Sequence, residues 1–498
     1  MRNAVVKCKA AGSAAVIVSM LCTFACVGPR YHTRIDEYIS YEAAYDSVRI
    51  GRPPPLWIEH PEIDSLISRT FARNPDILTA WARVEQARAA AGLTTANLLP
   101  SVNASATASR TKTTGVGSSL DPTGGQQQAP LGGGAPQPQL SEQTTHVNQF
   151  QGSLAASYEV DLWGKLWRRR FAAVQEADAA RFDAHAMSIS ITARVTDTWL
   201  MIVAQRQTVD LLENQLDVSK RFAELIELRF THGMAPASDM VQQNQQVESI
   251  RGRLELAKGR MRTLEHQLAI LLGRIPNHDV AVKERSLPQP PELPIDGVPV
   301  DLLELRPDIQ SAWLRLKAAD ARAAGALFEM LPSLRLSANL FSNADEIAEL
   351  FEEWLWSISA SASQPLFTGG RLIAGYRQVK ASAEAQYYAY LKSTLAALKE
   401  VRDALVLIRR QESYMQSLSE QVSAAQKALR LSRERYAQGA LPYLQVLTSL
   451  QSLQQIQQNR IEAQRQLLSY HVQLYRAMGG GSGASATSPT ARKDDTHG

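Results

Sequence analysis

Residues 149–162 read QFQGSLAASYEVDL, and in this stretch apolar and polar residues alternate. The even-numbered positions from Phe150 to Leu162 are apolar, whereas the odd-numbered positions carry glutamine, serine and acidic residues, with Ala155 as the exception. A period of two places the two classes on opposite faces of a β-strand. A different pattern begins soon afterwards, since residues 165–231 contain neither glycine nor proline. The sequence therefore predicts a two-faced strand that leads directly into a long helix.

Three further runs alternate in the same way, at residues 102–109, 333–340 and 354–363. Strands of about ten residues with one polar face and one apolar face are typical of outer-membrane strands, which have water on one side and lipid on the other. A half-buried hairpin of a soluble protein would explain any single run, but four runs weaken that alternative. Aromatic residues near both ends suit the membrane interfaces. They are Phe150, Phe341, Trp354 and Trp356 near the loops, and Trp163, Trp167 and Phe367 at the opposite end.

The sequence contains an internal repeat. Asn74-Pro75-Asp76-Ile77 recurs as Arg306-Pro307-Asp308-Ile309, and Arg229, Gly233 and Pro236 recur as Arg435, Gly439 and Pro442. The two members of the second set lie closer together in the sequence than the two members of the first set. The first copy therefore carries an insertion between these motifs. Residues 110–145 are that insertion, because they consist mainly of glycine, proline, glutamine, serine and threonine. A segment with so few large apolar residues cannot bury a core, and we predict a loop.

Each copy also predicts the same helices. Residues 165–231 and 371–437 should each form a helix of about 100 Å, longer than any globular core. Each ends at a reverse turn with glycine and proline, and a returning helix follows at residues 238–272 or 443–478. The helix before the first hairpin, predicted over residues 62–98, and the returning helix together match the long helix in length. We therefore expect them to stack end to end beside it.

Apolar residues in the long helices recur at spacings of three, four and seven, as in Leu211, Val218, Phe222 and Leu225. This spacing predicts a coiled-coil seam. Gln215 interrupts the apolar stripe, so the seam is not strictly apolar.

The first residues read as a targeting signal. Arg2, Lys7 and Lys9 precede an apolar stretch that is too short to span a membrane. The sequence Thr23-Phe24-Ala25-Cys26 then resembles a bacterial lipobox, although a lipobox usually has leucine and a small residue where Thr23 and Phe24 stand. In that interpretation Cys26 is lipidated, with an N-terminal diacylglycerol and palmitate as the covalent lipid and no other cofactor. The alternative is an ordinary signal peptide.

Composition excludes several classes of protein. The formal charge is +4, from 53 basic and 49 acidic residues, which is too small and dispersed for a nucleic-acid-binding surface. Three cysteines cannot form a disulfide framework or a four-ligand zinc site. The sequence lacks a glycine-rich phosphate loop, His-Glu-x-x-His and Gly-x-Ser-x-Gly, so we expect no enzyme. A mean hydropathy of −0.21 argues against a multi-helix membrane protein but not against a β-barrel.

These observations predict a mainly α protein with a β-barrel portion. Four strands cannot close a barrel alone, and lipid does not tolerate open strand edges, so the chain should oligomerise. Two copies would give eight strands and a filled interior, and three would give twelve strands and a lumen. The predicted segments are a signal peptide (1–25), a lipidated N-terminal extended segment (26–60), a first structural repeat (61–273), a Pro-rich connector (274–300), a second structural repeat (301–478) and a disordered tail (479–498).

From residue 26 to about 478 the chain resembles the outer membrane factor family, the TolC-like channels, and within it the NodT/OprM-type efflux lipoproteins. The resemblance rests on motifs that are weak singly and specific together. They are Cys26-Val27-Gly28-Pro29-Arg30-Tyr31, where the family usually has Asp in place of Arg30; the Asn74–Ile77 and Arg306–Ile309 pair; Pro365-Leu366-Phe367 with Gly369-Gly370-Arg371; and Arg435-Tyr436 with Gly439.

The resemblance implies a homotrimer with one twelve-stranded transmembrane barrel and a long periplasmic α-helical barrel, lipid-anchored and inserted in the outer membrane. It also implies docking to a periplasmic adaptor (membrane fusion protein) and an RND-type inner-membrane transporter. Such a channel passively conducts drugs or other small molecules out of the cell. The competing interpretations are the channel of a type I protein secretion system or, in another class, a periplasmic adaptor. The sequence does not identify the substrate.

In the family, helix hairpins close the periplasmic end and open when the adaptor docks. By position, the candidates in this chain are Gly233 and Asp239 in the first copy and Gly439 and Gln445 in the second. Asp239 could supply a carboxylate that gives the constriction a cation preference. A helix cap is the alternative role for Asp239. Gln445 stands where the family commonly has Asp, which puts an acidic ring in doubt.

Overall fold

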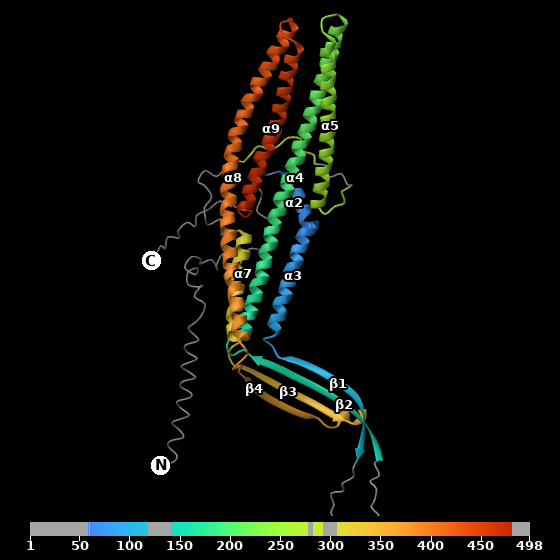
Figure 1. Cartoon of the computed structure of the whole chain (residues 1–498), viewed down its shortest axis with the longest axis vertical. Coiled ribbons are helices and arrows are strands. Elements are labelled where there is room, and N and C mark those ends of the chain that lie inside the picture. The colour runs from blue at the N-terminus through green and yellow to red at the C-terminus, as the bar shows by residue number, and fades with distance from the viewer. Residues whose placement is uncertain (1–57, 59, 118–140, 277–281, 292–305, 481–498) are drawn as a thin grey trace, which may run out of the picture. The chain divides into compact units, whose positions relative to one another are not determined.

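The computed structural model describes residue 58 and residues 60–117, 141–276, 282–291 and 306–480 (Figure 1). Cys26 and the predicted signal peptide lie outside the described residues, as does nearly all of the predicted tail. The chain divides into two compact units. We call them the helical unit, with residues up to Ala90, Ala172–Asp320 and from Lys380 onward, and the sheet unit, with Ala91–Phe171 and Ala321–Val379.

The order of elements repeats along the chain. Each copy has a helix or helix pair, a β-hairpin, a long helix and a returning helix. The first copy contains α2 (Pro61–Arg73), α3 (Pro75–Ala96), β1 (Ser101–Gly117), β2 (Ser141–Val160), α4 (Lys165–Thr231) and α5 (Ala237–Leu271). The second contains α7 (Pro307–Phe328), β3 (Ser333–Ala344), the short 3₁₀ helix η2 (Ile347–Phe351), β4 (Leu355–Ser363), α8 (Arg371–Ala437) and α9 (Tyr443–Ala477).

The two long helices confirm the prediction to the residue, since α4 and α8 each have 67 residues. The absence of glycine and proline over most of their length explains why nothing interrupts their backbone hydrogen bonds. Figure 1 shows α5 returning beside α4, and α9 returning beside α8. No helix in the described ranges is both long and apolar enough to cross a membrane.

The prediction of one helix over residues 62–98 is wrong at a single point. Asn74 has extended backbone geometry, with ψ of 123°, and separates α2 from α3. The cause is Pro75, whose ring disfavours the helical conformation in the residue before it. The buried Asn74 side chain then caps α3, because its Oδ1 accepts the backbone N–H groups of Asp76 (2.9 Å) and Ile77 (3.1 Å).

The helical unit confirms the expected end-to-end stacking. Asn74 Nδ2 donates to the backbone oxygen of Leu271, at the end of α5, over 2.8 Å. In the second copy Arg306 Nη1 donates to the oxygen of Ala477, at the end of α9, over 2.7 Å. The contact at the first junction is close, because a Cβ on Gly273 would lie 2.3 Å from the oxygen of Arg73. The repeated motif before each Pro-Asp-Ile thus ties a returning helix to the helix that starts beside it.

The sheet unit contains one antiparallel sheet in the order β1-β2-β3-β4. The register places the predicted polar residues together on one face, where Ser105 and Ser153 hydroxyls lie 2.7 Å apart and those of Ser337 and Ser359 lie 3.2 Å apart. The apolar residues share the other face, and Ile358 there is 75% exposed. β1 and β4 are the edge strands, so their outer backbone groups have no partner within this sheet.

The predicted loop over residues 110–145 needs correction at both ends. β1 continues to Gly117 and β2 begins at Ser141, with paired residues from Arg110↔Asn148 to Gly117↔Ser141. Backbone hydrogen bonds between antiparallel strands need no apolar side chains, so a polar composition does not end a hairpin. Composition identified the insertion but not the strand extension within it.

Candidate functional site

The two predicted turns have the same geometry. Gly233 has φ of +73°, the Met234 N–H donates to the oxygen of Arg229 (2.8 Å), and the Gly233 N–H donates to that of Phe230 (2.9 Å). Gly439 has φ of +74° and makes the corresponding bonds. This is the Schellman arrangement, in which the residue of positive φ is normally glycine. The two glycines therefore shape the hairpin tips, which we define as residues 232–236 and 438–442.

Asp239 and Gln445 occupy matching positions, each as the third residue of its returning helix. The residue at the cap of α5 is Pro236, which makes no side-chain capping bond, so Asp239 is not the cap. Its carboxylate lies in the first helical turn, where the helix dipole favours negative charge. Burial raises the pKa of Asp239, while a hydrogen bond from Ser238 and the charge of Arg229 act in the opposite direction. A cation preference from Asp239 stays a prediction.

An aromatic and arginine cluster lies behind the tips, and the sequence did not indicate it. The Arg229 guanidinium lies 4.6 Å from the ring centroid of Tyr436, and that of Arg433 lies 5.1 Å from the ring of Phe222. Tyr443, which is 1% exposed, packs against Tyr436 with ring centroids 5.7 Å apart. Burial raises the pKa of the Tyr443 hydroxyl. These contacts connect α4, α8 and α9.

Glutamines join the α4–α5 hairpin to the α8–α9 hairpin. Gln246 Nε2 donates to Gln454 Oε1 (3.0 Å), and Gln451 Nε2 donates to Gln246 Oε1 (2.8 Å). Gln215 Nε2, on α4, donates to Gln457 Oε1 over 3.2 Å. We call these five residues, together with Gln243, the glutamine seam. Gln243 accepts a hydrogen bond from the Tyr443 hydroxyl and donates to the oxygen of Ser219 over 2.6 Å.

Within each hairpin, by contrast, the contacts are apolar. Val209, Leu212, Ile250 and Leu254 pack α4 against α5. A second cluster packs α8 against α9 and also includes Ile226 of α4; its members are Ile226, Val422, Leu429, Tyr436, Tyr443, Val446, Leu447, Leu450 and Leu453. A hydrogen bond contributes only about 0.5–1.5 kcal/mol net, whereas each fully buried leucine contributes about 1.5–3 kcal/mol. The hydrogen bonds of the seam therefore contribute less than the apolar packing, which also joins the hairpins where Ile226 belongs to the α8–α9 cluster.

Several buried polar atoms near the seam have no hydrogen-bond partner in the described part of the chain. They are Gln215 Oε1, Ser219 Oγ, Arg229 Nε, Gln242 Oε1, Arg433 Nε, Tyr436 Oη, Gln454 Nε2 and Gln458 Nε2. Each unsatisfied buried group raises the free energy of this arrangement.

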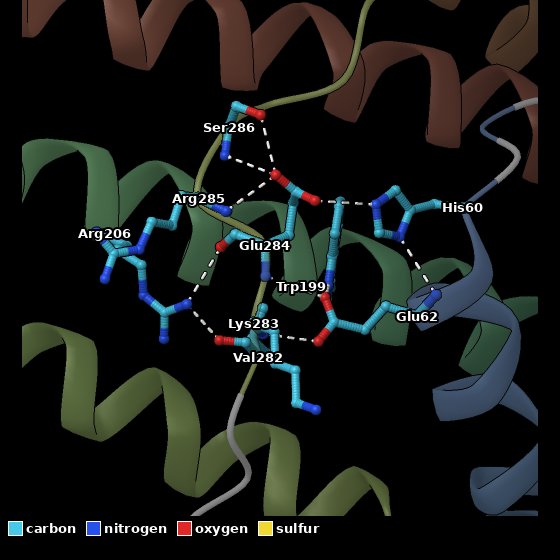
Figure 2. A network of polar contacts seen from close by, with 9 residues as sticks. All are labelled: His60, Glu62, Trp199, Arg206, Val282, Lys283, Glu284, Arg285 and Ser286. Carbon is cyan, nitrogen blue, oxygen red and sulfur yellow. Dashed lines mark hydrogen bonds and ion pairs between the residues drawn. The ribbon is translucent and has the colours of Figure 1, made fainter.

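A second polar cluster, the connector clasp, involves residues 282–291 of the predicted connector (Figure 2). The Glu62 carboxylate, in the first turn of α2, accepts hydrogen bonds from Trp199 Nε1 (3.0 Å) and from the backbone N–H groups of Lys283 (2.7 Å) and Glu284 (3.4 Å). Arg206 of α4 donates to the backbone oxygens of Val282 and Glu284. The connector is thereby held across the middle of α4.

Glu284 completes the clasp. Its Oε1 accepts hydrogen bonds from the backbone and hydroxyl of Ser286 and from the backbone of Arg285, and these bonds lower the pKa of Glu284 to about 2. Its other oxygen lies 3.3 Å from His60 Nε2, and the His60 ring packs 4.9 Å from that of Trp199. The clasp closes over the main hydrophobic core of the helical unit, in which Trp199 is fully buried.

The structure therefore brings Gly233 to Asp239 and Gly439 to Gln445 into matching turns, and adds the seam and the clasp. One signal of the seam was present in the sequence, because Gln215 interrupts the apolar stripe. Among the described residues, no group of three or more His, Cys, Asp or Glu side chains could hold a metal ion.

A family model described as outer membrane efflux protein matches residues 66–274 and 298–480. The pyoverdine export outer membrane protein OpmQ of Pseudomonas putida is 31% identical over 434 residues, 86% of this chain and 88% of OpmQ. The probable outer membrane lipoprotein SilC of Salmonella typhimurium is 26% identical over 425 residues, 84% of this chain and 86% of SilC. The crystal structure of CusC, 23% identical, has the same fold, with a TM-score of 0.75 over 87% of this chain and 96% of that chain.

Proposed function

Because the chain belongs to the outer membrane efflux protein family, and so acts as an outer-membrane efflux channel, we propose how it assembles and opens. Three copies close one twelve-stranded barrel. The observation that carries this proposal is the sheet, which has one hydroxyl-rich face, one apolar face and two edge strands, β1 and β4, each with one unpaired edge. Lipid does not tolerate open edges, and twelve strands leave a lumen where eight would not.

Channels of this family work with a periplasmic adaptor and an inner-membrane pump. For this chain we propose an adaptor of the membrane fusion class, an RND-type pump and small-molecule cargo, with no catalytic step of its own. OpmQ is named for pyoverdine export, but the pump selects the cargo, so that name does not decide the substrate here. A covalent lipid on Cys26 supplements the barrel as a membrane anchor.

Opening is proposed to occur by separation of the α4–α5 hairpin from the α8–α9 hairpin at the glutamine seam. The seam consists of hydrogen bonds between side chains and includes unpaired polar atoms, whereas each hairpin has an apolar interior. Separation there breaks side-chain hydrogen bonds that water can replace. It also exposes the apolar contacts of Ile226 with α8 and α9 and of Phe222 with Tyr443. The hairpins can therefore move as units when an adaptor contacts their tips.

Fractionation and electrophoresis test the assembly. The protein should be recovered with outer membranes and should migrate as a trimer without heating and as a monomer after heating. It should also restore drug efflux to cells that lack their own outer-membrane channel but retain the adaptor and pump. A monomer in the soluble periplasmic extract, or a heat-resistant dimer, would contradict the proposal.

A further inference from the structure

The apolar face of the sheet changes character near its loop end. On β1 the even-numbered side chains are Val102, Ala104, Ala106 and Ala108, and the same face then continues with Arg110 and Lys112. Alternate residues of a strand share a face, so the two cations follow the apolar row rather than the polar one. Both side chains are exposed, and neither has an ion-pair partner among the described residues.

The neighbouring strand provides polar groups at the same level. The register pairs Ala108 with Phe150, Arg110 with Asn148 and Lys112 with His146. Asn148 and His146 therefore lie on the same face as the cations, and both are exposed. Phe150 marks the last apolar position on this face of β2 in this direction.

The length of the apolar row indicates the depth in the membrane at which Arg110, Lys112, His146 and Asn148 lie. From Phe150 to Val160 the strand advances ten residues, about 33 Å at about 3.3 Å per residue. With a strand tilt of about 40°, this length spans about 25 Å, the height of the apolar band of an outer-membrane barrel. Arg110 and Lys112 lie immediately beyond it, at the depth of the lipid headgroups on the loop side.

We propose that Arg110 and Lys112, with His146 and Asn148, form a binding site for the phosphate groups of a phosphorylated lipid in the outer leaflet. Arginine and lysine bind phosphate by charge-assisted hydrogen bonds, and the amide and imidazole add further N–H donors. Cations at headgroup depth are attracted by an anionic lipid surface. Phe150 adjoins the acyl chains at the interface. The inference rests on the outer-membrane placement of the sheet.

The test uses full-length trimers extracted from outer membranes. Native mass spectrometry measures the bound lipid A-containing glycolipid in the parent, in Arg110→Gln/Lys112→Gln and in the charge-conserving control Arg110→Lys/Lys112→Arg. The glutamine variant should retain about tenfold less of this lipid, and the control should match the parent. Trimers in phosphatidylcholine nanodiscs should take up lipid A but not its dephosphorylated form, and excess inorganic phosphate should not displace the lipid.

Equal retention by the glutamine variant would overturn the proposal. Displacement by inorganic phosphate would show a site for the free anion instead of the lipid. Acidic residues Glu352 and Glu353, which precede β4, are the competing partners, because β4 of a neighbouring copy could lie beside β1. In that case the glutamine variant would dissociate at a lower temperature with its bound lipid unchanged. Loss of the trimer or of outer-membrane recovery in the parent would instead contradict the proposed function.

Discussion

Asn74 shows how one side chain can join two elements far apart in sequence. It caps α3 through two backbone N–H groups and donates to Leu271, which lies 197 residues later. Asn74→Ala removes these bonds at a buried site and should lower stability by about 2–3 kcal/mol. Asn74→Ser keeps a capping oxygen and should lower stability by less. Asn214→Ala, at an exposed site on α4, is the control and should leave stability unchanged. Thermal unfolding of the trimer, followed by circular dichroism, measures the three stabilities. Equal loss for Asn74→Ala and Asn74→Ser would contradict the capping role and leave the bond to Leu271 as the whole effect.

His471 is a second residue whose burial affects the stability of the protein. It is 2% exposed in α9, and neither ring nitrogen has a hydrogen-bond partner among the described residues. Burial lowers the pKa of His471 to about 4, against 6.5 in the unfolded chain. The unfolded chain therefore binds the proton more readily, so stability is complete above pH 6.5 and is lost as the pH falls from 6.5 towards 4.

The expected loss between pH 7 and pH 5 is on the order of 2 kcal/mol. His471→Leu should remove this part of the pH dependence, and His266→Gln, at an exposed position on α5, should not. The measurement is the thermal midpoint of unfolding of the parent, His471→Leu and His266→Gln at pH 7 and at pH 5. A parallel acid-induced loss in His471→Leu would assign the effect to other groups.

At the scale of elements, the weakest contact should decide where the helical unit opens. Gln246→Ala removes two hydrogen bonds of the glutamine seam, which together contribute about 1–3 kcal/mol. We expect the open population, measured as single-channel open probability in planar bilayers, to rise about tenfold. Gln246→Leu/Gln454→Leu replaces the hydrogen bonds with apolar contact and should lower the open probability. Gln421→Ala, at an exposed position on α8, is the control, and a higher open probability in the leucine variant would exclude the seam as the opening contact.

The strands show what sequence patterning predicts well and where it stops. The alternation in 149–162 predicted both faces of β2 correctly, because one face is apolar and the other polar. It did not predict the extension of β1 to Gly117, since paired backbone groups hold that part of the hairpin whatever its side chains. Because of this extension, Arg110 and Lys112 lie on a strand instead of in a loop.

At the scale of the whole molecule, the proposed lipid anchor and the barrel are separate attachments to one membrane. Cys26→Ala should abolish incorporation of radiolabelled palmitate, because the thiol that carries the diacylglycerol is absent. Outer-membrane recovery and trimer migration should persist, since the strands bury far more apolar surface than acyl chains do. Cys22→Ala is the matched control and should label normally. Continued labelling of Cys26→Ala would contradict lipidation at this cysteine.

The sequence by itself determined the elements of this protein and their duplication. Periods of two and of about 3.6 residues, glycine at the turns and proline after Asn74 and Arg306 act locally, so they can be read without knowing what lies nearby. Only the tertiary structure decided how the elements join: Asn74 to Leu271, Gln246 to Gln454, and the connector clasp of Glu62 with Lys283 and Glu284. These contacts link residues about 200 positions apart, and no local pattern encodes such a partner.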